Sequence, residues 1–416
     1  MKIGLIGEKL GHSFSKLIHE RLADNPYDLI PLARDAVDRF LKERNFDGLN
    51  VTIPYKQTVI PYCDEVDPTA LEIRAVNTLV NQDGKLKGYN TDLGGFLYLV
   101  QSSGIPFAGK KVLILGSGGT SRTVMAAAKR LGARECYVVG RQRREGVISY
   151  EDCYALHRDA QVVVNTSPVG MYPNNGQCLF KLDQFPDCAG VVDVIYNPLY
   201  TELLLQAQER GIPCANGLQM LVAQAKYAQD LFQGRELPQE EIRRIYGELL
   251  RQQSNLVIIG MPSAGKTTIG RMAADALGKE FLDLDDLIIE KAGMSIPEIF
   301  SRFGEARFRE LEKEAAAEAS KRTGWVIATG GGCVKNAENM RHLRQNGVIV
   351  FLDRKLESLV TGSDRPLSSS VQALAQMYQE RLPLYQQYSD IRVENNGTPQ
   401  QAVRQIEEKY CEVLGA

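Results

Sequence analysis

The chain has 416 residues, of which 44% are hydrophobic and 24% are charged, and its formal net charge at pH 7 is -2. This length exceeds a single ordinary core and predicts two or three domains, while the near-neutral charge argues against a nucleic-acid partner. No run approaches the roughly 20 apolar residues of a membrane span, and the first strand-like run begins at Lys2 without a signal-peptide pattern. We therefore expect a cytoplasmic protein with small-molecule partners and no membrane partner.

Strand-like apolar runs alternate with helical stretches along the whole chain, which is typical of parallel α/β sheets. We predict an α/β fold in three parts. The first is a lobe at residues 1–100, completed by helices at about 217–247. The second is a Rossmann-like dinucleotide domain at residues 101–216, and the third is a domain at residues 255–416. A polar amphipathic helix is expected at residues 240–253, just before the third domain.

Polar residues recur in the first lobe at places where a simple core would not need them. Ser13-Phe14-Ser15 puts two hydroxyls at alternate positions, Lys56 follows a strand, and Asn90-Thr91-Asp92 adds an amide and a carboxylate. Each has a simpler structural explanation: a turn, a surface charge and a helix cap, respectively. Their number in one lobe nevertheless indicates a polar pocket.

A dinucleotide-type turn opens the second domain. The apolar strand 112–115 runs into Gly116-Ser-Gly118-Gly119-Thr120-Ser121, and a helical run follows from Thr123. Ser121 stands where the third glycine of the motif would be. The next strand ends in Arg141, with further arginines at 143 and 144, instead of an acidic residue for a ribose hydroxyl. Because arginines suit a 2′-phosphate, the pattern predicts NADP over NAD; a solvated basic turn is the alternative.

A complete phosphate-binding loop, Gly260-Met-Pro-Ser-Ala-Gly265-Lys266-Thr267, follows the apolar strand 256–259 and precedes a helix expected to open at Thr268. Such loops bind nucleoside triphosphates through backbone N–H groups, with the lysine on the β/γ-phosphates and the hydroxyl on magnesium. The expected nucleotide-binding residues are Gly260, Ser263, Ala264, Gly265, Lys266, Thr267 and Thr268.

Three later features narrow the reaction class. A strand is expected to end with carboxylates at alternate positions, Asp283 and Asp285. Arg309 and Glu312 share one face of a helix, although they could form a mere surface pair. Glycines 330–332 close a strand and leave the backbone open to close approach. The Asn-Lys-x-Asp segment of GTPases is absent.

Residues 1 to about 240 resemble shikimate dehydrogenase. The motifs that carry the resemblance are Ser13-Phe-Ser15, Asn50-Val-Thr52-Ile-Pro-Tyr-Lys56, Ala75-Val-Asn77-Thr78, Asn90-Thr91-Asp92, Gly116 to Arg122, Asn165 to Gly170, and Gly217 to Gln224. The resemblance implies that Ser13 and Ser15 hold the substrate carboxylate and that Lys56 and Asp92 form the catalytic pair. It places Thr52, Asn77, Asp92 and Gln224 around the ring hydroxyls. The implied NADP(H) site comprises Gly116, Gly118, Gly119, Thr120, Ser121, Arg141 and Met220.

Residues from about 254 to 416 resemble shikimate kinase, through the phosphate-binding loop and the features above together with Arg365-Pro-Leu367 and Arg381-Leu-Pro-Leu-Tyr385. The resemblance implies that Asp285, Arg309, Gly331, Gly332 and Arg381 hold shikimate. Asp285 would also act as base, Lys266 and Arg365 would stabilise the transferring phosphoryl group, and Thr267 and Asp283 would support Mg²⁺. The segment ahead of Arg365 lacks the second basic residue that the family often has, which is a departure in the expected lid.

The two resemblances together imply a bifunctional enzyme of the shikimate pathway. It would reduce 3-dehydroshikimate to shikimate with NADPH and then phosphorylate shikimate to shikimate 3-phosphate with ATP and Mg²⁺. Two alternatives stay open: the first half could be a quinate/shikimate dehydrogenase that uses NAD, or one half could be an inactive regulatory binding module. The sequence is also compatible with an oligomer.

Overall fold

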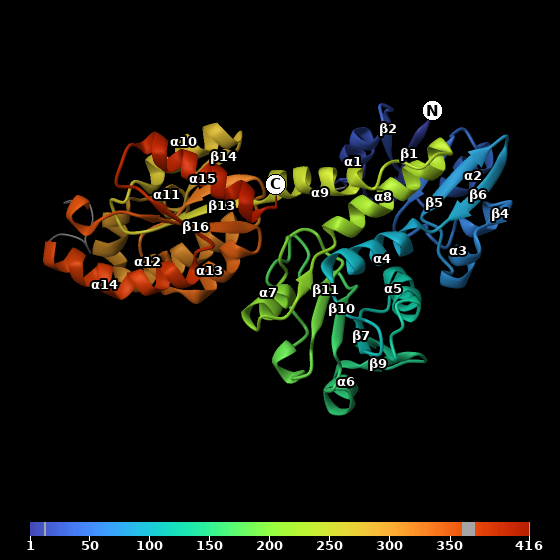
Figure 1. Cartoon of the computed structure of the whole chain (residues 1–416), viewed down its shortest axis with the longest axis horizontal. Helices are drawn as coiled ribbons and strands as arrows, with labels where there is room; N and C mark the ends of the chain where they lie inside the picture. Colours follow the sequence, from blue (N-terminus) through green and yellow to red (C-terminus); the bar gives the residue numbers. More distant parts are fainter. Residues whose placement is uncertain (12–13, 360–370, 416) are drawn as a thin grey trace. The chain divides into compact units, whose positions relative to one another are not determined.

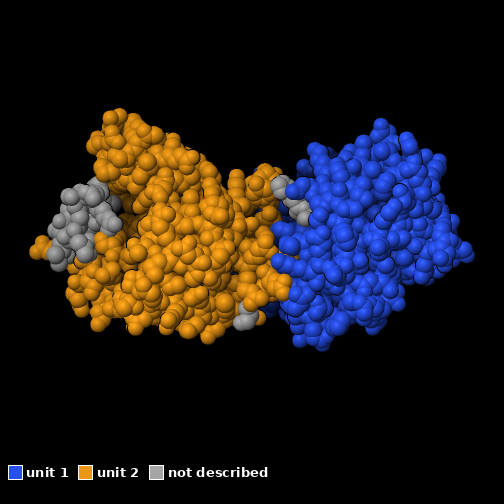
Figure 2. Space-filling model, turned by 90° about the horizontal axis from the view of Figure 1, so that it is seen from above, with its two compact units in different colours: residues 1–171, 177–196, 201–246 blue, residues 172–176, 197–200, 247–416 orange. Residues whose placement is uncertain are grey.

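The protein is described by a computed structural model that covers residues 1–11, 14–359 and 371–415. It forms two compact units, one of residues 1–171, 177–196 and 201–246 and one of residues 172–176, 197–200 and 247–416 (Figure 2). Three sheets flanked by helices confirm the predicted α/β class. Ser13 and Arg365, both predicted site residues, lie outside the described ranges. Within those ranges, no helix has the length and apolar character that crossing a bilayer requires.

The first lobe is built on a mixed sheet with the strand order β2-β1-β3-β5-β6-β4. β1 pairs in parallel with β2 and β3, whereas β5 runs antiparallel to β3 and β6. The lobe's strands and helices are β1 (Ile3–Gly7), α1 (Ser15–Leu22), β2 (Tyr27–Pro31), α2 (Val37–Glu43), β3 (Gly48–Val51), β4 (Glu65–Val66), α3 (Pro68–Ile73), β5 (Thr78–Gln82) and β6 (Lys85–Tyr89).

The second lobe of the same unit has a six-stranded sheet of order β12-β11-β10-β7-β8-β9, in which every pair is parallel. Its central strand β7 is flanked by β8 and β10, which places the turn after β7 at a topological switch point. The elements are α4 (Thr91–Ser103), β7 (Lys111–Leu115), α5 (Gly119–Arg130), β8 (Glu135–Gly140), β9 (Val147–Ser149), α6 (Tyr150–Leu156), β10 (Val162–Asn165), β11 (Gly190–Asp193), α7 (Glu202–Glu209) and β12 (Cys214–Ala215).

Helix α8 (Leu218–Gln233) returns from the second lobe to the first and packs along α4 (Figure 1). Phe232 is buried with Ile3 and Leu5 of the first sheet. A Cβ on Gly95 of α4 would lie 2.7 Å from the carbonyl oxygen of Met220, so only glycine permits this close approach. The first lobe is therefore completed by a segment far from it in sequence.

The second unit carries a five-stranded parallel sheet of order β14-β15-β13-β16-β17, preceded by α9 (Glu240–Gln253). Alternate residues of β13 face opposite sides, so Val257 packs with α12 and α13 while Ile258 packs with α10 and α15 (Figure 1). The elements are β13 (Asn255–Ile259), α10 (Lys266–Leu277), β14 (Glu280–Asp283), α11 (Leu284–Ala292), α12 (Ile296–Ala319), β15 (Trp325–Ala328), α13 (Ala337–Arg344), β16 (Gly347–Asp353), α14 (Val371–Tyr388), β17 (Ile391–Glu394) and α15 (Pro399–Val413).

Two helices begin earlier than the sequence predicted, and Asp285 lies in a helix where a strand was predicted. Helix α5 begins at Gly119, not Thr123, and α10 begins at Lys266, not Thr268. Asp285 lies in the first turn of α11, because β14 ends at Asp283, whose side chain accepts from the backbone N of Asp285. Glycine-rich turns supply few side-chain signals, so the first helical turn after them is easily assigned to the loop.

Candidate active sites

Lys56 and Asp92 form an ion pair in the first unit. Lys56 follows β3 and Asp92 lies in the first turn of α4, and their Nζ and Oδ2 atoms are 2.6 Å apart. Their side chains are 21% and 13% exposed, so ligands can reach a pair that is mostly shielded from solvent. Asn90 caps α4 by accepting from the backbone N of Leu93 at 3.2 Å, which fixes the helical turn that carries Asp92.

Other predicted substrate residues lie on segments that contact α4, α8 or the turn of Lys56. The Nδ2 of Asn77 donates to the Oγ1 of Thr91, the neighbour of Asp92, at 3.0 Å. Gln224 of α8 is buried, and its Cβ would lie 3.0 Å from a Cβ on Gly95 of α4. Thr52 lies in the same turn as Lys56. Ser15 is the first residue of α1, which packs on α8. The structure thus brings Asn77 beside the helical turn that carries Asp92, and it places Gln224 against α4 one turn further along.

The turn after β7 has the form of a dinucleotide site. Gly116 has φ +105°, and a Cβ there would lie 2.9 Å from the backbone N of Ser167, so glycine is required on both grounds. Gly118 is the N-cap of α5, and Gly119, Thr120 and Ser121 form its first turn. The Oγ of Ser121 donates to the carbonyl of Gly118 at 2.6 Å. A serine therefore fits where the motif has its third glycine.

Two arginines reach different places beside this turn. Arg141 follows β8 and is exposed. Arg144 donates from Nη2 to the Oγ of Ser117 at 2.6 Å and to its carbonyl oxygen at 3.3 Å, so its guanidinium lies on the glycine-rich turn itself. The sequence pointed to the cluster of Arg141, Arg143 and Arg144 and named Arg141 as the site residue, because a cluster of arginines does not show which one folds back onto the turn. Met220 is buried in α8 with the core of the second lobe.

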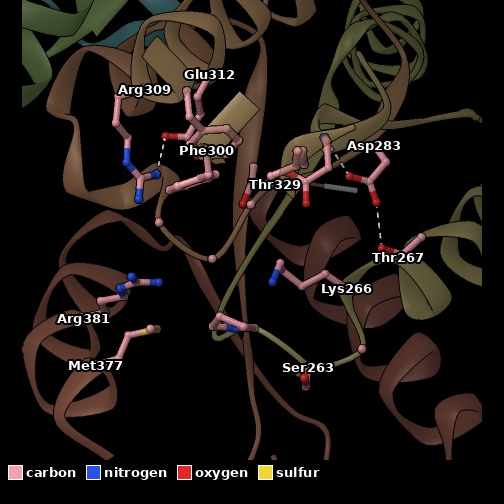
Figure 3. Close-up of a pocket in the computed structure, with 18 of the residues that line it drawn as sticks. Ser263, Lys266, Thr267, Asp283, Phe300, Arg309, Glu312, Thr329, Met377 and Arg381 are labelled. Atoms are coloured by element: carbon pink, nitrogen blue, oxygen red, sulfur yellow. Dashed lines mark hydrogen bonds and ion pairs between the residues drawn. The ribbon is translucent and has the colours of Figure 1, made fainter. Parts of the chain in front are cut away.

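In the second unit, a cavity of about 530 Å³ lies over the carboxyl ends of the strands. Figure 3 shows Arg309 and Arg381 at one end of it and the Thr267–Asp283 pair at the other, with Lys266 between them. Its lining comprises Pro262, Ser263, Gly265, Lys266, Thr267, Thr268, Asp283, Asp285, Ile296, Phe300, Phe308, Arg309, Glu312, Thr329, Gly330, Gly331, Gly332, Met377 and Arg381. Gly260 and Ala264 are not in the lining, although they belong to the same loop.

The phosphate-binding loop is held by its own lysine and by a carboxylate. The Nζ of Lys266 donates to the carbonyl oxygens of Gly260 and Met261 at 3.0 and 2.9 Å. The Oγ1 of Thr267 donates to the Oδ2 of Asp283 at 2.7 Å. Oxygen donors of these two kinds are those that Mg²⁺ prefers, so the pair fits a magnesium site.

Glycines 330–332, which follow β15, have neighbours so close that they leave little room for a side chain. A Cβ on Gly332 would lie 2.6 Å from the Nη1 of Arg309, and one on Gly331 would lie 2.6 Å from Pro262. A Cβ on Gly330 would lie 3.1 Å from the Oδ1 of Asp285. The missing Cβ atoms therefore let Arg309 and Asp285 approach this backbone.

Glu312 is a cavity residue that the sequence identified only as the partner of Arg309. Its side chain is 1% exposed, and its Oε2 accepts from the Nη1 of Arg309 at 2.9 Å. Burial raises the pKa of Glu312, and the charge of Arg309 opposes this rise. Among the described residues, its Oε1 has no hydrogen-bond partner. The pair thus holds the Arg309 guanidinium at the cavity, and the helical spacing was the signal for it.

Comparisons with known proteins match two different families to two parts of the chain. The family model "Shikimate dehydrogenase substrate binding domain" matches residues 5–79, and the model "Shikimate kinase" matches residues 262–411. The chain is 37% identical to a shikimate dehydrogenase (NADP(+)) of Moorella thermoacetica, over 64% of this chain and 97% of the relative.

Two solved structures are similar to the same part of the chain. One is a chorismate mutase/shikimate 5-dehydrogenase fusion protein of Clostridium acetobutylicum, with a TM-score of 0.57 and 33% identity, over 59% of this chain and 96% of that one. The other is a quinate dehydrogenase of Corynebacterium glutamicum in complex with NAD, with a TM-score of 0.54 and 29% identity, over 60% and 98% of the chains. The chain therefore belongs to the shikimate dehydrogenase family in its first part and to the shikimate kinase family at residues 262–411, and it is a bifunctional enzyme of the shikimate pathway.

Proposed function

We propose that the chain catalyses two consecutive steps, reducing 3-dehydroshikimate to shikimate with NADPH and then phosphorylating shikimate to shikimate 3-phosphate with ATP. The observation that carries the proposal is the Lys56–Asp92 pair at 2.6 Å, which gives the first unit a partly exposed proton donor. The proposed division places substrate residues in 1–100 and about 217–247, NADP(H) in 101–216 and the kinase in 255–416.

Bound NADPH would supply the hydride for the ketone carbon in the first step, and the chain must supply the proton. As the carbonyl oxygen gains negative charge, the ammonium of Lys56 donates a proton to it, which yields the hydroxyl of shikimate. Asp92 holds this ammonium in place through the 2.6 Å contact. Ser13 and Ser15 would bind the carboxylate, and Thr52, Asn77 and Gln224 would bind the ring hydroxyls.

The NADP(H) site would be formed by Gly116, Gly118, Gly119, Thr120, Ser121, Arg141 and Met220, to which we add Arg144. Arg144 supports the choice of NADP, because its guanidinium lies on the phosphate-binding turn. The similarity to a quinate dehydrogenase in complex with NAD keeps the alternative of quinate and NAD as a second candidate.

In the second step, Arg309 and Arg381 would bind the shikimate carboxylate, since guanidinium forks match a planar anion. Asp285 would accept the proton of the attacking hydroxyl, and Gly331 and Gly332 would lie against the ring. Lys266 would stabilise the β/γ-phosphates, while Thr267 and Asp283 would hold Mg²⁺, which neutralises phosphate charge. Arg365, outside the described residues, would add a positive charge to the transferring group.

One reaction mixture tests the proposal. The purified chain is incubated with 3-dehydroshikimate, NADPH, ATP and Mg²⁺, and NADPH absorbance is followed while shikimate 3-phosphate is assayed. We expect NADPH loss matched by phosphate-ester formation, with no ester when NADPH is omitted. NADPH loss without ester would refute the kinase assignment. No NADPH loss, followed by NAD reduction with quinate, would establish the second candidate, and inactivity of one half with retained ligand binding would identify a regulatory module.

A further inference from the structure

A chain of buried hydrogen bonds runs through the first lobe and ends at Asn77. It begins at Tyr27 in β2, where the phenol Oη donates to the Oδ1 of Asn50 in β3 at 2.7 Å. The Nδ2 of Asn50 donates to the Oγ1 of Thr78 at 3.2 Å, and this hydroxyl donates to the Oδ1 of Asn77 at 3.1 Å. All four side chains belong to residues that are 5% exposed or less.

The direction of this chain is set by backbone groups, which cannot exchange roles. The backbone N of Thr91 donates to Asn77 at 2.7 Å, so the atom facing it must be Oδ1 and the other amide atom must be Nδ2. The carbonyl oxygen of Asn77 accepts from Asn50 at 3.4 Å, which in the same way identifies the Nδ2 of Asn50. The donors of Tyr27 and Asn50 therefore point toward Asn77. The Thr78 hydroxyl, which accepts from Asn50, faces two partners, the Oδ1 of Asn77 at 3.1 Å and the Oγ1 of Thr91 at 3.2 Å.

The side chain of Tyr27, where the hydrogen bonds begin, is also fixed in place. Burial raises the pKa of Tyr27 well above its usual value, so the phenol keeps the proton that it donates. The ring of His19 stacks on Tyr27 with centroids 4.2 Å apart and an interplanar angle of 6°. Burial lowers the pKa of His19 to about 4, so the stacked imidazole is neutral at physiological pH. The stacking restricts Tyr27 without placing a charge beside it.

We propose that Tyr27, Asn50 and Thr78 are positioning residues that present Asn77 to the substrate as a hydrogen-bond donor. One N–H of the Asn77 Nδ2 is used by the Oγ1 of Thr91 at 3.0 Å, which leaves its second N–H for a ligand oxygen. Aligned donors polarise one another, which strengthens this last N–H. The inference rests on the proposed role of Asn77 as a substrate residue and specifies the group that it recognises, a ring hydroxyl oxygen that accepts.

Tyr27→Phe removes the first donor and nothing else. Shikimate oxidation by the full chain should then show a KM for shikimate about threefold to tenfold higher, because the line of polarised donors that ends at Asn77 loses its first member. The KM for NADP⁺ should stay unchanged and kcat should stay within about twofold, since Lys56 and Asp92 take no part in these hydrogen bonds.

Tyr55→Phe is the matched control. Tyr55 is 2% exposed, lies in the same lobe and donates from Oη to the carbonyl oxygen of Leu32 at 2.6 Å, outside the chain that ends at Asn77. Both variants should lower the melting temperature, but only Tyr27→Phe should raise the KM for shikimate. Equal KM changes in the two variants would mean general loosening of the lobe and would overturn the inference.

Three further variants, two at Thr78 and one at Asn77, separate this inference from the proposed substrate role of Asn77. Thr78→Val should raise the KM for shikimate and Thr78→Ser should restore it, which keeps the test decisive if Tyr27→Phe does not fold. If Asn77→Ala leaves the KM for shikimate unchanged, the substrate role of Asn77 is wrong. If Asn77→Ala raises it while Tyr27→Phe and Thr78→Val do not, the substrate role stands and the positioning chain is refuted.

Discussion

The two units each place a shielded lysine at their site, but the two lysines contact different partners. Lys56 contacts a carboxylate, the Oδ2 of Asp92, at 2.6 Å. Lys266 donates to two neutral carbonyl oxygens of its own loop, at 3.0 and 2.9 Å. A carboxylate partner holds an ammonium with a charge-assisted hydrogen bond, whereas carbonyls position the charge without cancelling it. The first arrangement suits ketone reduction and the second suits a phosphate ligand.

Removing Lys56 should produce the largest effect. In Lys56→Ala the alkoxide loses its proton donor, so kcat for dehydroshikimate reduction should fall by about 10²–10⁴, while kinase activity stays normal. The measurement is NADPH oxidation alongside shikimate phosphorylation on the same preparation. Lys87→Ala is the control, because Lys87 forms an ion pair with Glu65 at 3.0 Å in the same lobe. A comparable loss of kcat in both variants would contradict the proton-donor role.

Removing Lys266 should affect only the other unit. In Lys266→Ala the kcat of shikimate phosphorylation should fall by about 10²–10³, because a preorganised positive charge at the transferring group is lost. Lys279→Ala is the control, since Lys279 also donates to two backbone carbonyls, those of Arg251 and Ser254, at 2.6 and 2.9 Å. Lys279→Ala should cost stability and leave kcat near normal. Equal losses of kcat in the two variants would contradict a specific role of Lys266 in phosphoryl transfer.

The glycine segment gives a smaller and more selective prediction. The new methyl group of Gly332→Ala must displace the Arg309 guanidinium, which would lie 2.6 Å away. We expect a KM for shikimate about tenfold higher, with the KM for ATP unchanged. Gly247→Ala, in α9, is the control because its Cβ would meet nothing within 4 Å. A rise in the KM for ATP that matches the rise for shikimate would show that the segment does not act through Arg309.

Local patterns predicted much of both sites. The strand that ends at Ile259, the glycine-rich turn and the helix that begins at Lys266 are consecutive in the chain, so their order could be predicted from the sequence. The pairing of Arg309 with Glu312 followed from helical spacing and is confirmed at 2.9 Å. The α/β class followed from alternating strands and helices, because each unit repeats that alternation.

What the sequence could not predict depends on neighbours far away in the chain. The need for glycine at 331 and 332 arises from Pro262 and Arg309, which belong to other elements. The hydrogen-bond chain from Tyr27 to Asn77 spans β2, β1, β3 and β5, whose pairing is known only in the folded sheet. Likewise, the arginine that reaches the dinucleotide turn could be identified only after the loop following β8 had folded back onto it.

Arg144 gives the smallest expected effect and compares the two phosphate sites directly. The cation of the kinase loop is buried, but Arg144 is exposed, so solvent screens its interaction with a phosphate. Arg144→Ala should lower kcat/KM for NADPH by about threefold to tenfold and leave that for NADH unchanged. The loss should shrink at high salt, because screening already weakens the charge in the parent protein. Arg141→Ala, measured in parallel, tests the residue chosen from sequence, and a loss with Arg141→Ala alone would return the 2′-phosphate to Arg141 and reject Arg144.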